Sequence, residues 1–369
     1  MASQLFLTGL VPFLVSLLAC IAIVLTQRHH GHLTTDGQGG VQKLHSRPTP
    51  RVGGVGIALA AGTGGLLLAP EAQALWWPIC LTVIPAFAAG LIEDVTKRVS
   101  ARERLIATVL SGLLFVLWTG YSISGVDLPW IDSVLQFGLV ATVFTAVAIG
   151  GIANAINIID GVNGLSSGTV MICLGVLGYI AFAQGDMALV ACIVLCIAAV
   201  AGFFLVNFPF GRLFLGDAGA YSLGFLLAVF AVALPQRNPE VSPLIGLIVL
   251  IYPVTETLVS VWRRMVRVGS HPGRPDRLHL HSLVFRSQAR VAARRLGLPG
   301  LRNAMAAVLV FSMPLLSGFF ALLSYRDPLL ILAGIAMAVL AYLTFYRRVA
   351  LLEPTLTDRF LRGLKPQNV

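Results

Sequence analysis

The sequence contains few charged residues: Asp, Glu, Lys and Arg make up 11% of its 369 residues, whereas hydrophobic residues make up 57%. A soluble domain usually carries about 25% charged residues, because polar groups must cover its surface. A chain with so little charge cannot cover a water-facing surface, so most of its surface must face lipid. The sequence also lacks an internal repeat, a low-complexity tract and a separate soluble domain. We therefore expect one transmembrane domain over residues 1–369.

Cysteine motifs and a secretion signal are missing as well. The five cysteines show neither CxxC nor metal-ligand spacing, so we interpret them as small buried hydrophobic residues. The first apolar segment lacks the positively charged start and the small-residue cleavage site of a signal peptide. We expect this segment to be retained as a membrane helix.

Eleven long apolar segments are the main feature of the sequence. Each is near the roughly 20 residues that cross a bilayer as a helix, so they predict an all-α polytopic membrane protein. The segments are residues 5–26, 53–70, 76–92, 105–121, 133–153, 164–183, 187–206, 218–235, 243–262, 304–324 and 328–345.

The basic residues are distributed unevenly between these segments. Of 26 Lys and Arg residues, 24 lie in alternate connections, and only Arg237 and Arg326 lie in the others. This positive-inside bias predicts an N-terminus outside and a C-terminus in the cytoplasm. It also explains the net charge of +10 without nucleic acid, because a nucleic-acid binder would concentrate its basic residues in a soluble domain. The main cytoplasmic pieces are a loop at 263–303 and a tail at 346–369.

Polar residues gather at the predicted cytoplasmic ends of the helices. A charged group at the centre of a membrane helix costs on the order of 2.5–3.5 kcal/mol, so such groups tend to mark functional sites. Glu93 and Asp94 close one helix, Lys97 follows one turn later, and Arg104 begins the next helix. Adjacent carboxylates repel unless a cation or a proton is near. A solvated turn in which Lys97 and Arg98 supply the partners is an equally good reading.

The segment NAINIIDGVNGLSSG contains a second cluster. Asn154, Asn157 and Asp160 recur every three residues and share one helix face, and Asn163 lies in the glycine-containing turn that follows. This pattern favours a ligand or a metal, with hydrogen bonds between helices as the alternative.

The segment NFPFGRLFLGDAGAYSLG contains a third cluster. Asn207 ends a helix, Arg212 lies in the loop, and Asp217 begins the next span between Gly216 and Gly219. A helix N-terminus favours a carboxylate and also binds phosphate. The glycines indicate close backbone approach by a bulky group, and a simple helix cap is the alternative reading of Asp217.

The segment HPGRPDRLHLHSLVFR contains a fourth cluster. Its Arg277, His279 and His281 suit an anion, because guanidinium groups match phosphate geometry. Histidines two apart face opposite sides of a helix but converge from an extended backbone. A zinc site and a solvated loop are the alternatives.

Lys43, His45 and Arg51 form a fifth cluster just before the second span. Alone it could anchor anionic lipid. Together, the five clusters combine carboxylates, amides, a histidine pair and many cations. Mg²⁺ is usually held by one or two carboxylates plus substrate phosphates, and cations neutralise a phosphoryl group during transfer. The residues therefore predict phosphoryl transfer on an anionic, diphosphate-like substrate.

In their order along the chain, these motifs resemble those of the polyprenyl-phosphate N-acetylhexosamine-1-phosphate transferase family. The resemblance runs from His45 to about Arg286, and NAINIIDGVNGL and LFLGDAGAYSLG are its most specific parts. The HLH form and eleven helices are more similar to the N-acetylglucosamine branch than to the peptidoglycan branch.

The resemblance implies an enzyme of the bacterial cytoplasmic (inner) membrane. It would transfer N-acetylhexosamine-1-phosphate, most simply GlcNAc-1-phosphate, from a UDP-sugar to undecaprenyl phosphate and release UMP. This would be the first membrane step of a cell-envelope polysaccharide pathway, with Mg²⁺ or Mn²⁺ as cofactor. The hexosamine, the pathway, a one-step or covalent mechanism, and whether the chain forms a homodimer stay open.

The same resemblance implies residue roles. Asp217 matches the metal-binding aspartate, and Asp94 matches the second acid of a pair that acts on the lipid phosphate as base or orienter. Glu93 and Asp160 are the other predicted catalytic residues. We predict substrate-binding roles for Lys43, His45, Arg51, Lys97, Arg104, Asn154, Asn157, Asn163, Asn207, Arg212, Arg277, His279 and His281.

Two positions depart from the family pattern. Glu93 stands where the family has the first Asp of its pair, and Asn163 stands where a second Asp often follows the DG turn. An amide can hydrogen-bond but cannot act as a base, so Asp94 is the better base candidate. The main alternative function is a transporter of a nucleotide-sugar or a phosphate-bearing lipid. Transporters often show repeated halves and a midplane site, whereas here the polar residues lie at one face.

Overall fold

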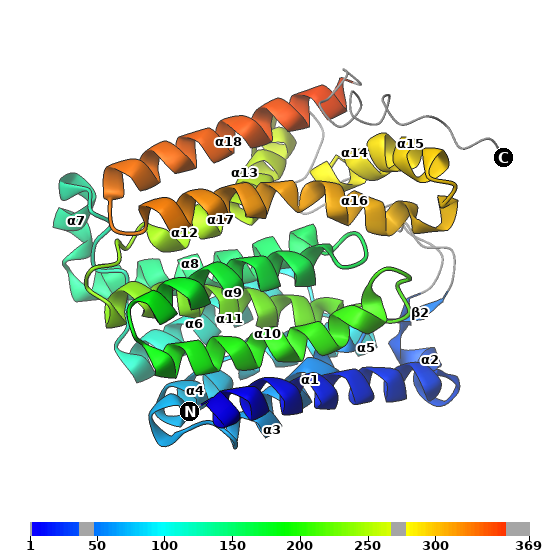
Figure 1. Ribbon diagram of the computed structural model, residues 1–369, viewed down its shortest axis with the longest axis horizontal. Helices are drawn as coiled ribbons and strands as arrows, with labels where there is room; N and C mark the ends of the chain where they lie inside the picture. The colour runs from blue at the N-terminus through cyan, green and yellow to red at the C-terminus, as the bar shows by residue number, and fades with distance from the viewer. Residues whose placement is uncertain (1, 37–47, 267–277, 352–369) are drawn as a thin grey trace.

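The computed structural model describes residues 2–36, 48–266 and 278–351, and it is built almost entirely of helices (Figure 1). The first helices are α1 (Ala2–Leu25), α2 (Gln27–Thr34), α3 (Gly53–Gly65), α4 (Pro70–Thr82), α5 (Ile84–Thr96), α6 (Ala101–Thr119), α7 (Pro129–Leu135), α8 (Gly138–Ile159) and α9 (Leu165–Ala183). The later ones are α10 (Met187–Asn207), α11 (Gly216–Arg237), α12 (Ile245–Val249), α13 (Ile251–Val266), α14 (Leu280–Arg286), α15 (Gln288–Arg295), the 3₁₀ helix η1 (Pro299–Leu301), α16 (Arg302–Val310), α17 (Ser312–Ser324) and α18 (Pro328–Ala350). Within the described residues, extended pairing is limited to β1 (Thr35–Asp36) and β2 (Thr49–Pro50), which run antiparallel.

The prediction of an all-α polytopic membrane protein is confirmed. Seven helical stretches in the described part of the chain are long and apolar enough to cross a membrane, and the bent pair α4–α5, with an angle of 43°, makes an eighth. The other expected spans fall on the 13-residue helix α3, on α6 with its charged first turn, and on the broken pair α12–α13. The total of eleven and the orientation stay predictions.

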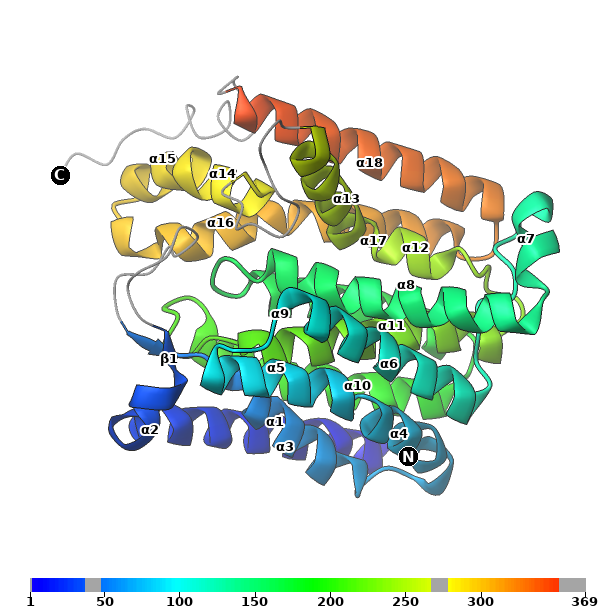
Figure 2. The ribbon, with the colours of Figure 1, turned by 180° about the vertical axis from the view of Figure 1, so that it is seen from behind.

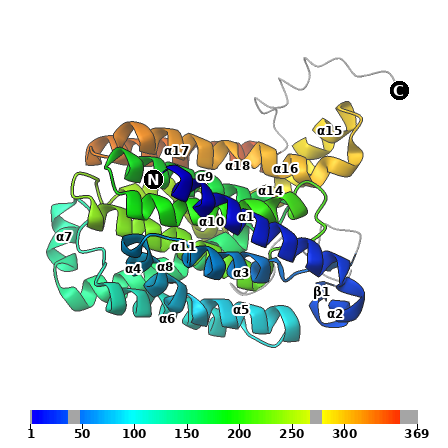
Figure 3. The ribbon, with the colours of Figure 1, turned by 60° about the horizontal axis from the view of Figure 1, so that its bottom comes forward.

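Helix α11 occupies the centre of the bundle. Most of its residues are buried inside the protein, as is typical of a helix that is apolar on every side. It packs against α3, α5, α6, α8 and α9. In Figures 1 and 2, α1 and α3 lie on one side of this central layer and α16–α18 lie on the other. Figure 3 shows α5 and α6 beside the same central helices.

Glycines bring two helices against the first turn of α11. A Cβ atom added at Gly54 in α3 would lie 2.4 Å from the backbone nitrogen of Gly219, and one added at Gly90 in α5 would lie 2.4 Å from that of Ala218. Small residues allow membrane helices to approach backbone to backbone. The glycines beside Asp217 were expected to admit a bulky group; at Gly219 an added Cβ would lie 2.9 Å from the Cα atom of Gly54, so the group that approaches there is the backbone of α3.

We expect Gly54→Ala to lower the melting temperature, because the added methyl group would overlap the α11 backbone and overpacking typically costs about 1–3 kcal/mol. Gly62→Ala in the same helix is the matched control, since its Cβ would meet nothing within 4 Å among the described residues. Alanine favours a helix over glycine by about 0.8–1.0 kcal/mol, so the control should melt at the wild-type temperature or above it. Thermal unfolding in detergent measures both, and an unchanged melting temperature for Gly54→Ala would contradict the packing argument.

Candidate active site

The carboxylate of Asp94 caps the N-terminus of α11 from outside that helix. Asp94 lies near the end of α5, and its side chain is fully buried. One oxygen accepts the N–H of Asp217 and the other accepts the N–H of Ala218, both at 2.9 Å. The first N–H groups of a helix lack partners within the helix and carry partial positive charge. Asp94 therefore neutralises the helix end on which Asp217 stands.

Gly216 makes this cap sterically feasible. Its φ is +75°, and an added Cβ would lie 2.6 Å from Asp94 Oδ2 and 2.1 Å from the carbonyl oxygen of Arg51. A left-handed φ is readily populated by glycine. The glycine before the aspartate is thus required by the backbone and the cap together.

Two arginines from distant segments converge on Asp217. Arg51, just before α3, donates from Nη2 to Asp217 Oδ1 at 2.9 Å, and its Nε lies 3.2 Å from Asp94 Oδ1. Arg104 of α6 donates from Nη1 to Asp217 Oδ2. Asn157 of α8 adds an amide hydrogen bond to Oδ1 at 3.2 Å. The structure thus brings five of the predicted site residues into one cluster.

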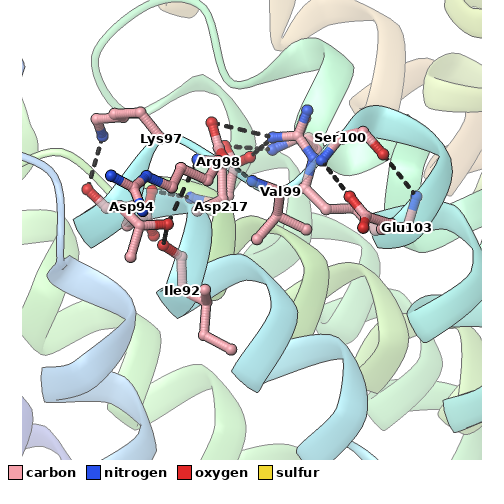
Figure 4. Close-up of polar contacts among 12 residues, drawn as sticks. Ile92, Asp94, Lys97, Arg98, Val99, Ser100, Glu103 and Asp217 are labelled. Carbon is pink, nitrogen blue, oxygen red and sulfur yellow. Dashed lines mark hydrogen bonds and ion pairs between the residues drawn. The ribbon is translucent and has the colours of Figure 1, made fainter.

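The turn between α5 and α6 places Arg104 in this cluster. Lys97 ends α5 with a φ of +58°, and its ammonium group donates to the carbonyl oxygen of Asp94 at 2.6 Å. Glu93 accepts the N–H of Val99 at 2.8 Å, and its other oxygen lies 4.0 Å from Arg104 Nη1. Figure 4 shows Asp94, Lys97 and Val99 around the reversal of the chain, with Asp217 beside them. Glu93 therefore holds the turn and also faces a guanidinium group of the cluster.

Asp160 lies next to the cluster, directly after α8. It accepts a hydrogen bond from the Ser166 hydroxyl. Burial raises the pKa of Asp160 to about 6, and the neighbouring Asp217 carboxylate adds to the rise, whereas Ser166 and Arg51 oppose it. Because burial and a neighbouring acid both disfavour the charged form of Asp160, a nearby cation would stabilise that charged form.

Asn207 and Asn163 tie the turn after Asp160 to the loop before α11. Asn207 accepts the N–H of Gly164 at 2.6 Å and donates to the carbonyl oxygen of Leu213 at 2.7 Å. Asn163 donates from its side chain to the carbonyl oxygen of Pro209 at 3.0 Å. Both amides thus hold two loops together, and a direct contact of either with substrate stays a prediction.

Other predicted residues lie apart from the Asp217 cluster. Asn154 donates to the Thr108 hydroxyl at 2.9 Å, which joins α8 to α6 as the alternative reading of that motif expected. Arg212 is exposed, and its guanidinium group lies 5.7 Å from the Phe210 ring centroid. Three further predicted residues lie outside the described part of the chain; they are Lys43, His45 and Arg277.

The two histidines converge, as an extended backbone predicts. His279 has extended angles before α14, His281 lies in its first turn, and their rings stack with centroids 5.5 Å apart. Their partner Glu256, whose Oε1 lies 2.9 Å from His279 Nδ1, was not predicted from the sequence. The sequence does contain a signal for Glu256, which is the single carboxylate inside the apolar segment 243–262. An ionisable residue within a membrane segment is a functional-site candidate by default.

A metal ion would need ligands beyond the side chains. Among the described residues, no group of three or more His, Cys, Asp or Glu side chains is arranged to hold a metal ion. The oxygen donors of Asp217, Asn157 and Asp160 nevertheless have the chemistry that Mg²⁺ prefers, with substrate phosphates completing the coordination. Asp160 and Asp217 are neighbouring acids whose charges repel, so a cation beside them would be electrostatically favourable. The residues thus fit Mg²⁺ bound together with a phosphate.

Comparison with known proteins finds a family model that matches part of the chain. Residues 76–235 match the family model described as glycosyl transferase family 4. The chain is 27% identical over 274 residues (73% of this chain, 75% of the relative) to a probable undecaprenyl-phosphate N-acetylglucosaminyl 1-phosphate transferase of Bacillus subtilis (strain 168).

Two further relatives, one of each named transferase type, match at a similar identity. The chain is 27% identical to a phospho-N-acetylmuramoyl-pentapeptide-transferase of Streptococcus pneumoniae (strain CGSP14), over 74% of this chain and 86% of the relative. It is 28% identical to an undecaprenyl-phosphate alpha-N-acetylglucosaminyl 1-phosphate transferase of Yersinia pestis, over 67% and 68%. The matched region contains α5, α6, α8 and the start of α11, which hold four of the five clustered residues. The central part of the chain, residues 76–235, is therefore similar to glycosyl transferase family 4.

Proposed function

We propose that the protein transfers an N-acetylhexosamine-1-phosphate, GlcNAc-1-phosphate in the first instance, from a UDP-sugar to undecaprenyl phosphate and releases UMP. The convergence of Arg51 and Arg104 on Asp217, beside the buried Asp94, carries this proposal. Guanidinium groups bind phosphate in a bidentate manner, and carboxylates beside them suit a metal that bridges phosphates. The relatives named as undecaprenyl-phosphate sugar-1-phosphate transferases support the same reaction class.

In this proposal each residue either binds a charged group or holds another residue in position. Arg51 and Arg104 bind the phosphates of donor and acceptor, and Asp94 keeps Asp217 in place through the α11 backbone. Asp217, with Asn157 and Asp160, would hold Mg²⁺ or Mn²⁺, which when bound neutralises charge on the diphosphate.

The bond changes are those of a phosphoryl transfer. An oxygen of the lipid phosphate forms a bond to the β-phosphorus, the bond from that phosphorus to the bridging oxygen breaks, and UMP leaves with the electron pair. Asp94 is fully buried with both oxygens occupied, which favours orienting over proton abstraction. A covalent aspartyl-phosphate route is the competing version.

The site is proposed to face the cytoplasm of a bacterial inner membrane. The positive-inside bias supports this orientation, and the donor UDP-sugar is a water-soluble substrate. The 263–303 segment, with His279 and His281, is proposed to bind the sugar-nucleotide, and residues 346–369, which begin within the last turns of α18, are proposed as the cytoplasmic tail. The pathway would assemble a cell-envelope polysaccharide.

We expect Asp217→Asn to lower UMP release by about 10²–10³-fold, the range found when one preorganised electrostatic group is removed from an active site. The assay combines purified protein with radiolabelled UDP-N-acetylglucosamine, undecaprenyl phosphate and Mg²⁺. Glu240→Gln is the control, because Glu240 is an exposed acid paired with Arg326, away from the cluster. Full metal-dependent UMP release by Asp217→Asn would contradict the assignment of Asp217 as a metal ligand.

We also expect chelation with EDTA to abolish transfer, and Mg²⁺ or Mn²⁺ to restore it, because the described side chains alone leave the diphosphate charge only partly neutralised. The same assay with a panel of UDP-sugars identifies the donor. Label should reach the lipid fraction with UDP-N-acetylglucosamine, and UMP should form in equal amount. Uptake of intact UDP-sugar into vesicles without UMP would instead indicate transport.

A further inference from the structure

Glu256 of α13 is a buried carboxylate that connects three helices. It is 1% exposed. Oε1 accepts from His279 Nδ1 at 2.9 Å and from the N–H of Leu280 at 3.2 Å, and Oε2 accepts from the Tyr342 hydroxyl at 2.7 Å. An ionised carboxylate can accept hydrogen bonds but cannot donate them. His279 must therefore carry a proton on Nδ1. One charge in α13 thereby fixes the start of α14 and a residue of α18.

The fixed segment places His281 against the turn that follows Asp160. The His279 and His281 rings are stacked 4° from parallel. A Cβ atom added at Gly161 would lie 2.0 Å from His281 Nε2, so the imidazole rests on the backbone of that turn. The contacts run without interruption from Glu256 through the two histidines to the residue beside Asp160.

His281 presents a polar atom with no partner. Its side chain is 4% exposed, and Nδ1 has no hydrogen-bond partner among the described residues. Burial and the neighbouring His279 lower the pKa of His281 to about 4, so the ring is neutral at physiological pH and offers one donor and one acceptor. Buried polar atoms without partners are rare and call for a ligand or an ordered water.

We infer that Glu256 is a positioning residue for the donor side of the active site. Through His279 it holds His281 against Gly161, where the histidine meets the diphosphate or sugar of the nucleotide-sugar. Carboxylates that orient a functional histidine in this way are common second partners at metal and catalytic sites. The inference rests on the proposed function, and it assigns Glu256 to donor binding rather than to the Asp217 cluster.

The test compares three buried variants of the full-length protein. Glu256→Gln keeps the size of the side chain but loses its charge, and Tyr342→Phe removes one of its donors. Tyr252→Phe is the matched control: Tyr252 lies in the same helix, its ring centroid is 6.4 Å from that of Tyr342, and its hydroxyl has no partner among the described residues.

Initial rates of UMP release give KM separately for UDP-N-acetylglucosamine and undecaprenyl phosphate. Loss of a histidine-orienting partner typically costs about 10- to 100-fold, so we expect Glu256→Gln to raise KM for the nucleotide-sugar by about that factor. KM for the lipid should stay unchanged. Tyr342→Phe should give a smaller change in the same direction, and Tyr252→Phe should give none.

Hydrogen exchange of the 278–286 peptide gives a readout that does not need activity. We expect faster exchange at the Leu280 amide in Glu256→Gln and wild-type exchange in Tyr252→Phe. If wild-type protein releases no UMP with any donor, the proposed function fails, while exchange still tests whether Glu256 holds the segment. Unchanged exchange, or faster exchange with an unchanged donor KM, overturns the inference, as does an equal rise in KM for both substrates. If Glu256→Gln does not fold, Tyr342→Phe decides by the same criteria.

Discussion

The cap that Asp94 places on α11 is the interaction on which the site depends. It joins a carboxylate of α5 to the free N–H groups of the central helix, in a place too buried for water to substitute. Arg51 is the main counter-charge, since its guanidinium group contacts both Asp94 and Asp217. An unpaired buried charge is strongly unfavourable, so cap, arginine and Asp217 form one electrostatic unit. In the proposed function, a phosphate that takes the arginines would leave the Asp217 oxygens in need of another cation, which would couple phosphate binding to metal binding.

The sequence was sufficient to predict that the acids of distant motifs meet, because ionisable residues in so apolar a chain can lie only where water or a partner reaches them. Asp94, Asp160 and Asp217 were recognised for this reason, and the structure places them together. The roles of the individual side chains were harder to predict. The alternative of a helix cap was assigned to Asp217, whereas the cap is Asp94 from a different helix. Partners more than 120 residues away cannot be read from local spacing.

Glycines illustrate the same limit. Gly216 and Gly219 beside Asp217 were interpreted as room for a bulky group, yet Gly219 faces the backbone of Gly54, and Gly216 faces the Arg51 carbonyl and the Asp94 carboxylate. A pattern of small residues indicates a close approach but not what approaches. Glu256 is the opposite case, because a single carboxylate in an apolar segment is visible in the sequence. Its partners come from residues 279, 280 and 342, and helix packing alone determines them.

The far end of α11 shows why the site lies at one face of the bundle. At its last turn, Arg237 forms two hydrogen bonds with Asp186, which caps the start of α10. The helix therefore has an acid at its N-terminus and a cation at its C-terminus, which is the arrangement that the helix dipole favours. Its 22 residues extend about 33 Å at 1.5 Å per residue, close to the roughly 30 Å of a bilayer core. Charge pairs at both ends therefore hold the helix in its position along the axis. Asp217 is thus kept at one end of the bundle, where in the proposed function a water-soluble donor and the phosphate of a lipid acceptor would both reach it.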